Sequence, residues 1–179
     1  NIVNSHMECT GRFAGGIFGQ IGGAVTIDNV NVQATVRAWK GEAGGLTGDG
    51  SNNISITNSV FDCKVSELFN TEDRCGAGGL VGSIFYTGAK KTLTVNNVQV
   101  LGSVDGVQSG GLVGVVRNIS HEWNLTLIVV GVGNNVVGET SGKLIGAFQT
   151  GENAKTLVTD RLSQVYTLEN GKPDLGEKT

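Results

Sequence analysis

Apolar and polar residues alternate with a period of two along most of the chain. The stretches 25–30, 54–59 and 93–98 have the sequences VTIDNV, ISITNS and LTVNNV, and a second alternating stretch follows each within a few residues. This period places apolar side chains on one face of a β-strand, and the frequent Val, Ile and Thr suit a pleated sheet. No stretch keeps a 3.6-residue period over three turns of helix. The pattern predicts an all-β protein with little helix.

A glycine motif recurs between these strands. It has the sequences GGIFG, GGLTG, GGLVG, GGLVG and the degenerate GKLIG, with 29 to 34 residues between successive first glycines. We expect each Gly-Gly pair to form a corner, because glycine adopts positive φ and lets stacked backbones approach closely. The predicted corner glycines are Gly15, Gly16, Gly44, Gly45, Gly78, Gly79, Gly110, Gly111 and Gly142. The apolar third residues, predicted to point into the core, are Ile17, Leu46, Leu80, Leu112 and Leu144.

The repetition predicts a stacked architecture. One repeat cannot bury its own apolar stripe, whereas a coiled chain that lays each repeat on the last buries a continuous core. Backbone hydrogen bonds then join successive repeats at about 4.8 Å. We therefore predict a parallel β-helix, or β-solenoid, of about five stacked repeats in residues 11–168, with an N-terminal extension in 1–10 and a C-terminal tail in 169–179.

Asparagines occupy one position of the strand that follows the glycine motif. They are Asn29, Asn58 and Asn97 in the first three repeats. Their stacked side-chain amides can form a hydrogen-bonded ladder. Val129 and Arg161 take this position in the fourth and fifth repeats, so we expect the ladder to end before them.

The motifs GGLTG, GGLVG and GGLVG, each followed by a strand of the form xTIxN, resemble the GLUG repeat, named for Gly-Leu-hydrophobic-Gly. The resemblance covers residues 11–168. GLUG repeats occur in large surface proteins, adhesins and the non-catalytic parts of some secreted bacterial proteases. The resemblance implies a right-handed parallel β-helix or related solenoid in an extracellular protein. Two features depart from the family: the repeats are longer than in many GLUG arrays, and Lys143 replaces the second glycine of the last motif, as in an atypical terminal repeat.

Charge and hydropathy argue against two classes of partner. The 179 residues carry a net charge of -3 with acids and bases scattered, so no basic patch for nucleic acid is evident. The longest apolar stretch, LTLIVVGVG at 125–133, is shorter than the ~20 residues that span a bilayer. We predict neither nucleic-acid binding nor membrane insertion. Because the chain starts with Asn rather than Met, we expect it to be processed or excised from a longer protein.

Residues that could carry catalysis are scarce and dispersed. His6 and His121 are expected in a terminus and a loop, and no C-x-x-C or H-x-x-x-H spacing occurs. Asp28 and Asp160 share a repeat position but belong to the first and last repeats, while Asp62 has no evident partner. These residues are therefore expected on solvated faces.

Two glycine-rich segments resemble ligand-binding loops only superficially. GETSGKL at 138–144 lacks the spacing and the strand-loop-helix context of a phosphate loop. GDGSNN at 48–53 is rich in oxygen atoms but lacks the spacing of a calcium loop, which favours a tight turn. We predict no catalytic, cofactor-binding or metal-binding residues.

The cysteines and sequons leave several modifications open. Cys63 and Cys75 could close a disulfide in an oxidising compartment, or Cys63 could be a buried free thiol. N-glycosylation sequons begin at Asn53, Asn118 and Asn124, and they support a secretory route only weakly because Asn, Ser and Thr are abundant.

The two tryptophans are the candidates for carbohydrate contact. Trp39 and Trp123 are expected in loops, where an indole can stack on a sugar ring. Packing against a neighbouring loop or subunit is the favoured alternative for both.

The function expected from these features is non-enzymatic. We expect a structural or adhesive β-solenoid segment of an extracellular or cell-surface protein, or a filament subunit. The alternative is a polysaccharide-active β-helix enzyme, which needs clustered carboxylates on one sheet face. Neither end of the chain has a convincing cap, so the expected partners are further repeats or copies of the chain stacked head to tail.

Overall fold

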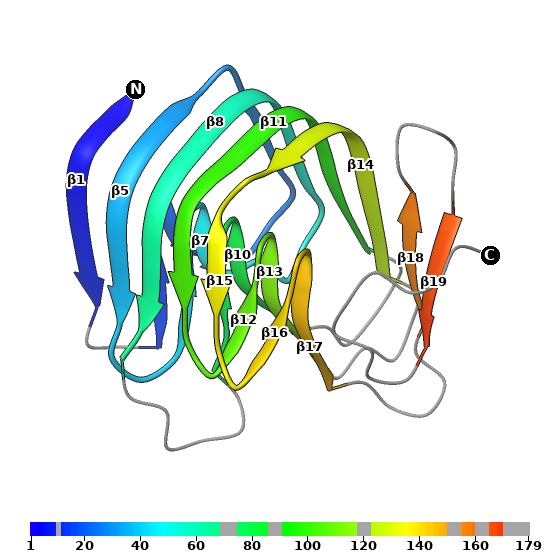
Figure 1. Ribbon diagram of the computed structural model, residues 1–179. Coiled ribbons are helices and arrows are strands. Elements are labelled where there is room, and N and C mark those ends of the chain that lie inside the picture. The colour runs from blue at the N-terminus through cyan, green and yellow to red at the C-terminus, as the bar shows by residue number, and fades with distance from the viewer. Residues whose placement is uncertain are drawn as a thin grey trace.

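The computed structural model describes residues 1–9, 12–68, 75–85, 91–117, 123–149, 155–159 and 165–169. These residues contain no helix. Their strands form three parallel sheets that coil into a β-solenoid of about four turns, which confirms the predicted fold class (Figure 1).

A long sheet arches over two short sheets. The long sheet contains β1 (Ile2–Cys9), β4 (Val25–Asp28), β5 (Asn31–Ala38), β8 (Ile54–Glu67), β11 (Lys91–Asp105), β14 (Trp123–Val132), β15 (Asn135–Val137), β18 (Lys155–Thr159) and β19 (Val165–Glu169). The first short sheet contains β2 (Phe13–Gly15), β6 (Glu42–Gly44), β9 (Ala77–Gly78), β12 (Gln108–Gly110) and β16 (Thr140–Gly142). The second short sheet contains β3 (Phe18–Gln20), β7 (Thr47–Asp49), β10 (Val81–Phe85), β13 (Val113–Arg117) and β17 (Ile145–Gln149).

Equivalent positions of successive repeats lie side by side. Leu93 of β11, for example, pairs with Ile54 of β8 and Leu125 of β14. The fifth glycine motif supplies β16 and β17, after which β18 pairs in parallel with β14 and in antiparallel with β19. The prediction of about five repeats is therefore one too many, because this antiparallel pair takes the place of a further complete turn.

The asparagine positions bend the long sheet into its arch. Asn29, Asn58 and Asn97 have φ angles of 54°, 50° and 53°. This left-handed conformation is uncommon outside glycine, and asparagine is one of the residues that adopts it most easily. Asn58 and Asn97 lie inside the continuous strands β8 and β11, which therefore change direction without ending.

A side-chain ladder follows this bend, as predicted, but its first member is different. Nδ2 of Asn97 donates to Oδ1 of Asn58 over 2.9 Å, and Nδ2 of Asn58 donates to Oδ1 of Asp28 over 2.9 Å. Asp28 takes the place of the expected Asn29, and its Oδ1 also accepts a hydrogen bond of 2.6 Å from the Thr57 hydroxyl. The hydrogen bond from Thr57 is the main cause of a lowered pKa of Asp28, and the hydrogen bond from Asn58 adds to it. The side chain of Val129 and the whole of Arg161 lie outside the described parts of the chain.

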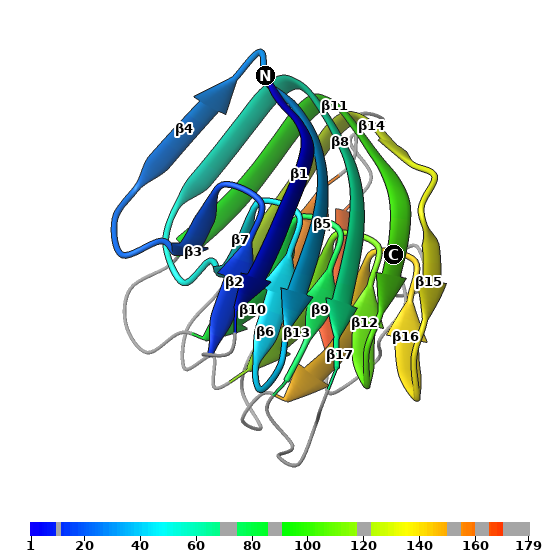
Figure 2. The same ribbon diagram turned by 90° about the vertical axis from the view of Figure 1, so that its left-hand side faces the viewer.

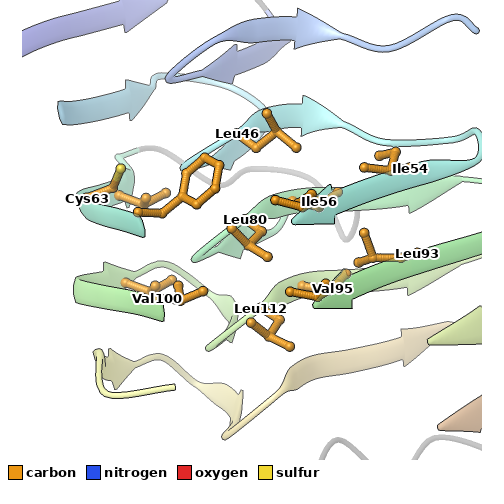
Figure 3. Close-up of a cluster of buried hydrophobic side chains, with 14 of the residues drawn as sticks. Leu46, Ile54, Ile56, Cys63, Leu80, Leu93, Val95, Val100 and Leu112 are labelled. Atoms are coloured by element: carbon orange, nitrogen blue, oxygen red, sulfur yellow. The ribbon is translucent and has the colours of Figure 1, made fainter. Parts of the chain in front are cut away.

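The core is a column of motif leucines beneath the arch. Leu46, Leu80 and Leu112 are fully buried and Leu144 is 6% exposed, which confirms the prediction for all four. Figure 3 shows the first three stacked between the two arms of the long sheet. Ile17, the first member of the column, is only partly buried because no turn of the described chain covers its outer side.

The glycine motif brings the two short sheets into backbone contact. A Cβ atom on Gly78 would lie 1.9 Å from the carbonyl oxygen of Val81, and one on Gly82 would lie 2.7 Å from the amide nitrogen of Ala43. The predicted close approach is therefore confirmed. The predicted positive φ is wrong, since the glycines with positive φ in the described chain are Gly41 and Gly102, and neither is a corner glycine. Glycine is required here by space and not by backbone conformation.

Candidate binding cleft

Cys63 and Cys75, the two candidate disulfide cysteines, are free thiols in the structure. Cys63 points into the core, where its Sγ lies 3.9 Å from the carbonyl oxygen of Val32. Cys75 is buried near the Glu67 carboxyl, which accepts a hydrogen bond from its thiol. Burial raises the pKa of Cys63 to about 11 and that of Cys75 to about 12, so both thiols are protonated and unreactive at neutral pH. Cys63 and Cys75 therefore form no disulfide in this structure. Cys63 is a buried free thiol, which was the alternative expected from the sequence.

The sequon asparagines lie just before the long sheet, on it, or outside the described chain. Asn53 is exposed, and its Oδ1 accepts a hydrogen bond of 3.0 Å from the Thr92 amide. Asn118 falls outside the described residues. The backbone of Asn124 belongs to β14, but its side chain is not among those described. Glycosylation at these positions stays a prediction.

Of the aromatic and histidine candidates, Trp39 and His6 contact the same carboxylate, that of Glu8. Trp39 is 37% exposed, and its indole N–H donates to Glu8, a carboxylate that also contacts His6. The Trp39 hydrogen bond is the main cause of the lowered pKa of Glu8. His121 and the side chain of Trp123 lie outside the described parts.

The acidic candidates are separate. Asp28 belongs to the ladder on the bend, and Asp62 lines a surface hollow with Gln33 and Lys64. Asp160 is outside the described residues. The predicted solvated positions of Asp28 and Asp62 are thus consistent with the structure, and among the described residues no second carboxylate lines a cleft with either aspartate.

A cleft lies at one end of the two short sheets. The strands of the first short sheet begin here and those of the second end here, so side chains from both sheets meet. The cavity has a volume of about 370 Å³. Its deep wall is formed by Glu42, Asp49, Ser83 and Arg117, and its rim by Arg12, Phe13, Gln20 and Phe85.

Three residues that line the cleft form a polar row along the second short sheet. Gln20, Asp49 and Ser83 occupy the same position in the first three turns and are neighbours in the parallel register. Nε2 of Gln20 donates to Oδ2 of Asp49 over 2.8 Å, while Oδ1 of Asp49 accepts from the Ser51 amide over 3.1 Å. Both carboxylate oxygens of Asp49 are therefore held in fixed orientations. The GDGSNN segment forms a turn around this carboxylate, in agreement with the turn favoured from its sequence.

An ion pair closes the deep wall. Nη2 of Arg117 binds Oε1 of Glu42, with side chains only 4% and 3% exposed. Burial raises the pKa of Glu42 even though the Arg117 guanidinium opposes the shift. The two residues lie two turns apart, so the arginine side chain runs along the solenoid axis across the cleft.

Buried polar atoms of the wall without a hydrogen-bond partner among the described residues include Oε2 of Glu42 and Oγ of Ser83, on residues that are 3% and 1% exposed. More than nine in ten buried polar groups in proteins are paired. Both atoms are shielded from solvent in this structure, and both belong to residues that line the cleft.

This geometry suits ligand binding better than proton transfer. A glycoside hydrolase needs one carboxyl group as acid and another as base or nucleophile, both facing the substrate. Here Glu42 is paired with Arg117, and both oxygens of Asp49 accept hydrogen bonds from protein donors. The same groups offer a fixed array of donors and acceptors to a bound molecule.

The sequence analysis missed this cleft, although one pattern pointed to it. The position five residues after the first glycine of the motif is polar in the first three repeats, as Gln20, Asp49 and Ser83, and apolar in the last two, as Val115 and Ala147. A polar row at an otherwise apolar position of a solenoid indicates a local site. Arg117 carries no such pattern, because its ion pair depends on a side chain that crosses two turns.

Comparison with protein-family models, curated proteins and solved structures found no match. The resemblance to the GLUG repeat therefore stays a prediction. Within the described ranges, no helix is long and apolar enough to cross a membrane. Nor do three or more His, Cys, Asp or Glu side chains of these ranges gather into a site that could hold a metal ion.

Glu67, which lies beside Cys75, is expected to make stability depend on pH. Burial raises its pKa above 4.5, and hydrogen bonds from the Val107 amide and the Cys75 thiol only partly oppose this. The folded protein therefore holds this proton more tightly than the unfolded chain, so its contribution to stability rises as pH falls through the raised pKa and levels off below 4.5. Glu67→Gln should resist urea better than the parent at neutral pH, and the difference should shrink toward pH 4.5. A difference in urea midpoint that grew on acidification would contradict this assignment.

Proposed function

We propose that the protein is a non-enzymatic structural or adhesive segment of an extracellular or cell-surface protein, and that its N-terminal face is covered by another turn of the same kind. The observation that carries this proposal is the open edge of that face. β1, β2, β3 and β4 each pair on one side only within the described chain (Figure 2). Unpaired strand edges template the addition of further strands.

The hydrogen bonds at the glycine corners define what fits there. The carbonyl oxygen of Leu80 accepts from the amides of Leu46 and Thr47 in the preceding turn, and the same pattern recurs at each motif leucine. The counterpart in the first turn is the carbonyl of Ile17, for which the described residues supply no preceding turn. A further glycine motif stacked on this face would supply the missing donors.

The two ends of the solenoid differ in a way that favours growth at the N-terminal face. At the opposite end, β19 runs antiparallel along β18 and interrupts the parallel order of the long sheet. The N-terminal face has only parallel pairings behind its edges. Extension by preceding repeats of a longer chain therefore meets a matching surface. Head-to-tail stacking of copies would pair this face with the interrupted end, and it would give a heterologous contact that can propagate.

The extracellular placement is supported by the resemblance of the glycine motif to a repeat of surface proteins and adhesins. Within the described ranges, the shortage of converging groups for proton transfer supports a non-enzymatic role. The best-formed cluster, the wall of the cleft, has its carboxylates engaged with protein partners.

Self-association of the isolated chain tests the open face. Light scattering should show reversible, concentration-dependent association, because the outer edges of β1 to β4 have backbone groups that can pair with strands of another copy. Phe18→Lys places a charge on the edge strand β3, at a side chain that is 37% exposed, and should give a monomer. Leu101→Lys, equally exposed but on the internal strand β11, is the matched control and should associate like the parent. A parent chain that stays monomeric at high concentration would refute the proposal.

A further inference from the structure

We propose that the cleft between the two short sheets binds a neutral, hydroxyl-rich ligand of monosaccharide size. The proposal does not depend on the role of the N-terminal face. It rests on the volume of the cleft, its unpaired buried polar atoms and the balance of charge along its wall.

The cleft has the size and access of a small-molecule site. Its volume of about 370 Å³ lies within the range of about 300 to 1,000 Å³ common for such sites. Arg12 and Gln20 are exposed at the rim, and Phe85 is 43% exposed, while Glu42 and Ser83 lie deep. The rim is therefore open to a ligand, and the side chains of Glu42 and Ser83 must turn toward the cavity for their unpaired oxygens to contact it.

The wall contains groups that a ligand would satisfy. Oγ of Ser83 and Oε2 of Glu42 both lack a partner within the described chain, and both belong to residues that line the cavity. A buried hydroxyl without a partner lowers stability, so a structural role alone does not account for a serine at this position. The equivalent position in the next turn is Val115, which shows that an apolar side chain fits the same sheet.

The charges of the wall select a neutral polar molecule. Glu42 and Asp49 disfavour a bound anion, while Arg12 and Arg117 disfavour a bound cation. A hydroxyl group donates to a carboxylate and accepts from a guanidinium, so a molecule with several hydroxyls matches both kinds of group at once. This argument favours a polyol or a sugar over an ionic ligand.

Aromatic residues at the rim favour a sugar ring over a linear polyol. Phe13 and Phe85 line the cleft on the strands β2 and β10, one from each short sheet. The apolar face of a pyranose packs against aromatic rings while its hydroxyls turn toward polar groups. The cleft thus has aromatic rings for the apolar face of a pyranose and polar groups for its hydroxyls, at a place distinct from Trp39.

Ligand binding can be measured with methyl glycosides of glucose, galactose and mannose, with glucuronate and glucosamine as charged comparators. Protein-observed NMR titration should show at least one neutral glycoside shifting amide signals of β7 and β10, and the charged sugars binding more weakly by about tenfold. Ser83→Ala should weaken this binding by about tenfold and leave the protein folded, because it removes an unpaired buried hydroxyl. Trp39→Ala is the control and should bind like the parent.

Three outcomes would overturn the proposal. The first is that no neutral glycoside shifts signals around the cleft at millimolar concentration, which would mean that the cavity holds only water. The second is that Ser83→Ala stays folded and binds as tightly as the parent. The third is that Trp39→Ala abolishes binding while Ser83→Ala does not, which would move the site to the loop tryptophan.

Discussion

Gly78→Ala is expected to reduce the free energy of unfolding by about 3 kcal/mol or more, or to prevent folding. The added Cβ would lie 1.9 Å from the carbonyl oxygen of Val81 and 2.7 Å from the amide nitrogen of Gly114. Both atoms are backbone atoms of the second short sheet, so no side-chain rotation relieves the contact. The two short sheets would have to separate, and their separation would pull the leucine column away from the long sheet. Denaturant titration of the purified variant measures the loss.

Gly23→Ala is the matched control for this prediction. A Cβ at Gly23 meets no atom within 4 Å, and its φ is not in the left-handed region. The change should therefore alter the free energy of unfolding by no more than about 1 kcal/mol, and in the stabilising direction. Equal losses at Gly78 and Gly23 would show that contact between the short sheets is not what the motif glycines provide.

The stacked fold could be predicted because its contacts repeat with the sequence. In a parallel solenoid the neighbours of a residue are its equivalents in adjacent turns, so a period found in the sequence is also a contact map. Leu80 illustrates this: its shared position with Leu46 and Leu112 was enough to place all three in one column. The same reasoning located the ladder on the bend, since Asn58 and Asn97 differ in sequence number by one repeat.

The mistakes arose where one sequence feature has two physical explanations. A glycine that recurs at one position of each repeat can be needed for a positive φ or because a side chain would have no space. The sequence alone does not distinguish these two explanations. In the structure, a side chain at Gly78 or Gly82 would collide with the neighbouring backbone, and neither glycine has a positive φ. The number of turns was overestimated for a similar reason, because an apolar strand after the fifth motif is compatible with either parallel stacking or the antiparallel pair β18–β19.

The cleft could be anticipated only in part, because its contacts combine equivalent and non-equivalent positions. Gln20, Asp49 and Ser83 share one repeat position and could have been found by comparing repeats. Glu42 and Arg117 are 75 residues apart and occupy different repeat positions, so nothing in the period joins them. Such a pair becomes visible only when side-chain length and the spacing of turns are known together.

Arg117→Leu is expected to reduce the free energy of unfolding by about 3 to 5 kcal/mol. The substitution leaves the Glu42 carboxylate buried without its cation, at a side chain that is 3% exposed. The double variant Glu42→Leu with Arg117→Leu should recover most of the loss, because a buried ion pair and an apolar pair of similar volume differ little in net stability. Denaturant titrations of the parent, both single variants and the double variant give the coupling energy between the two sites. If Arg117→Leu alone costs less than about 1 kcal/mol, the pair is exposed to solvent and the deep wall of the cleft is open.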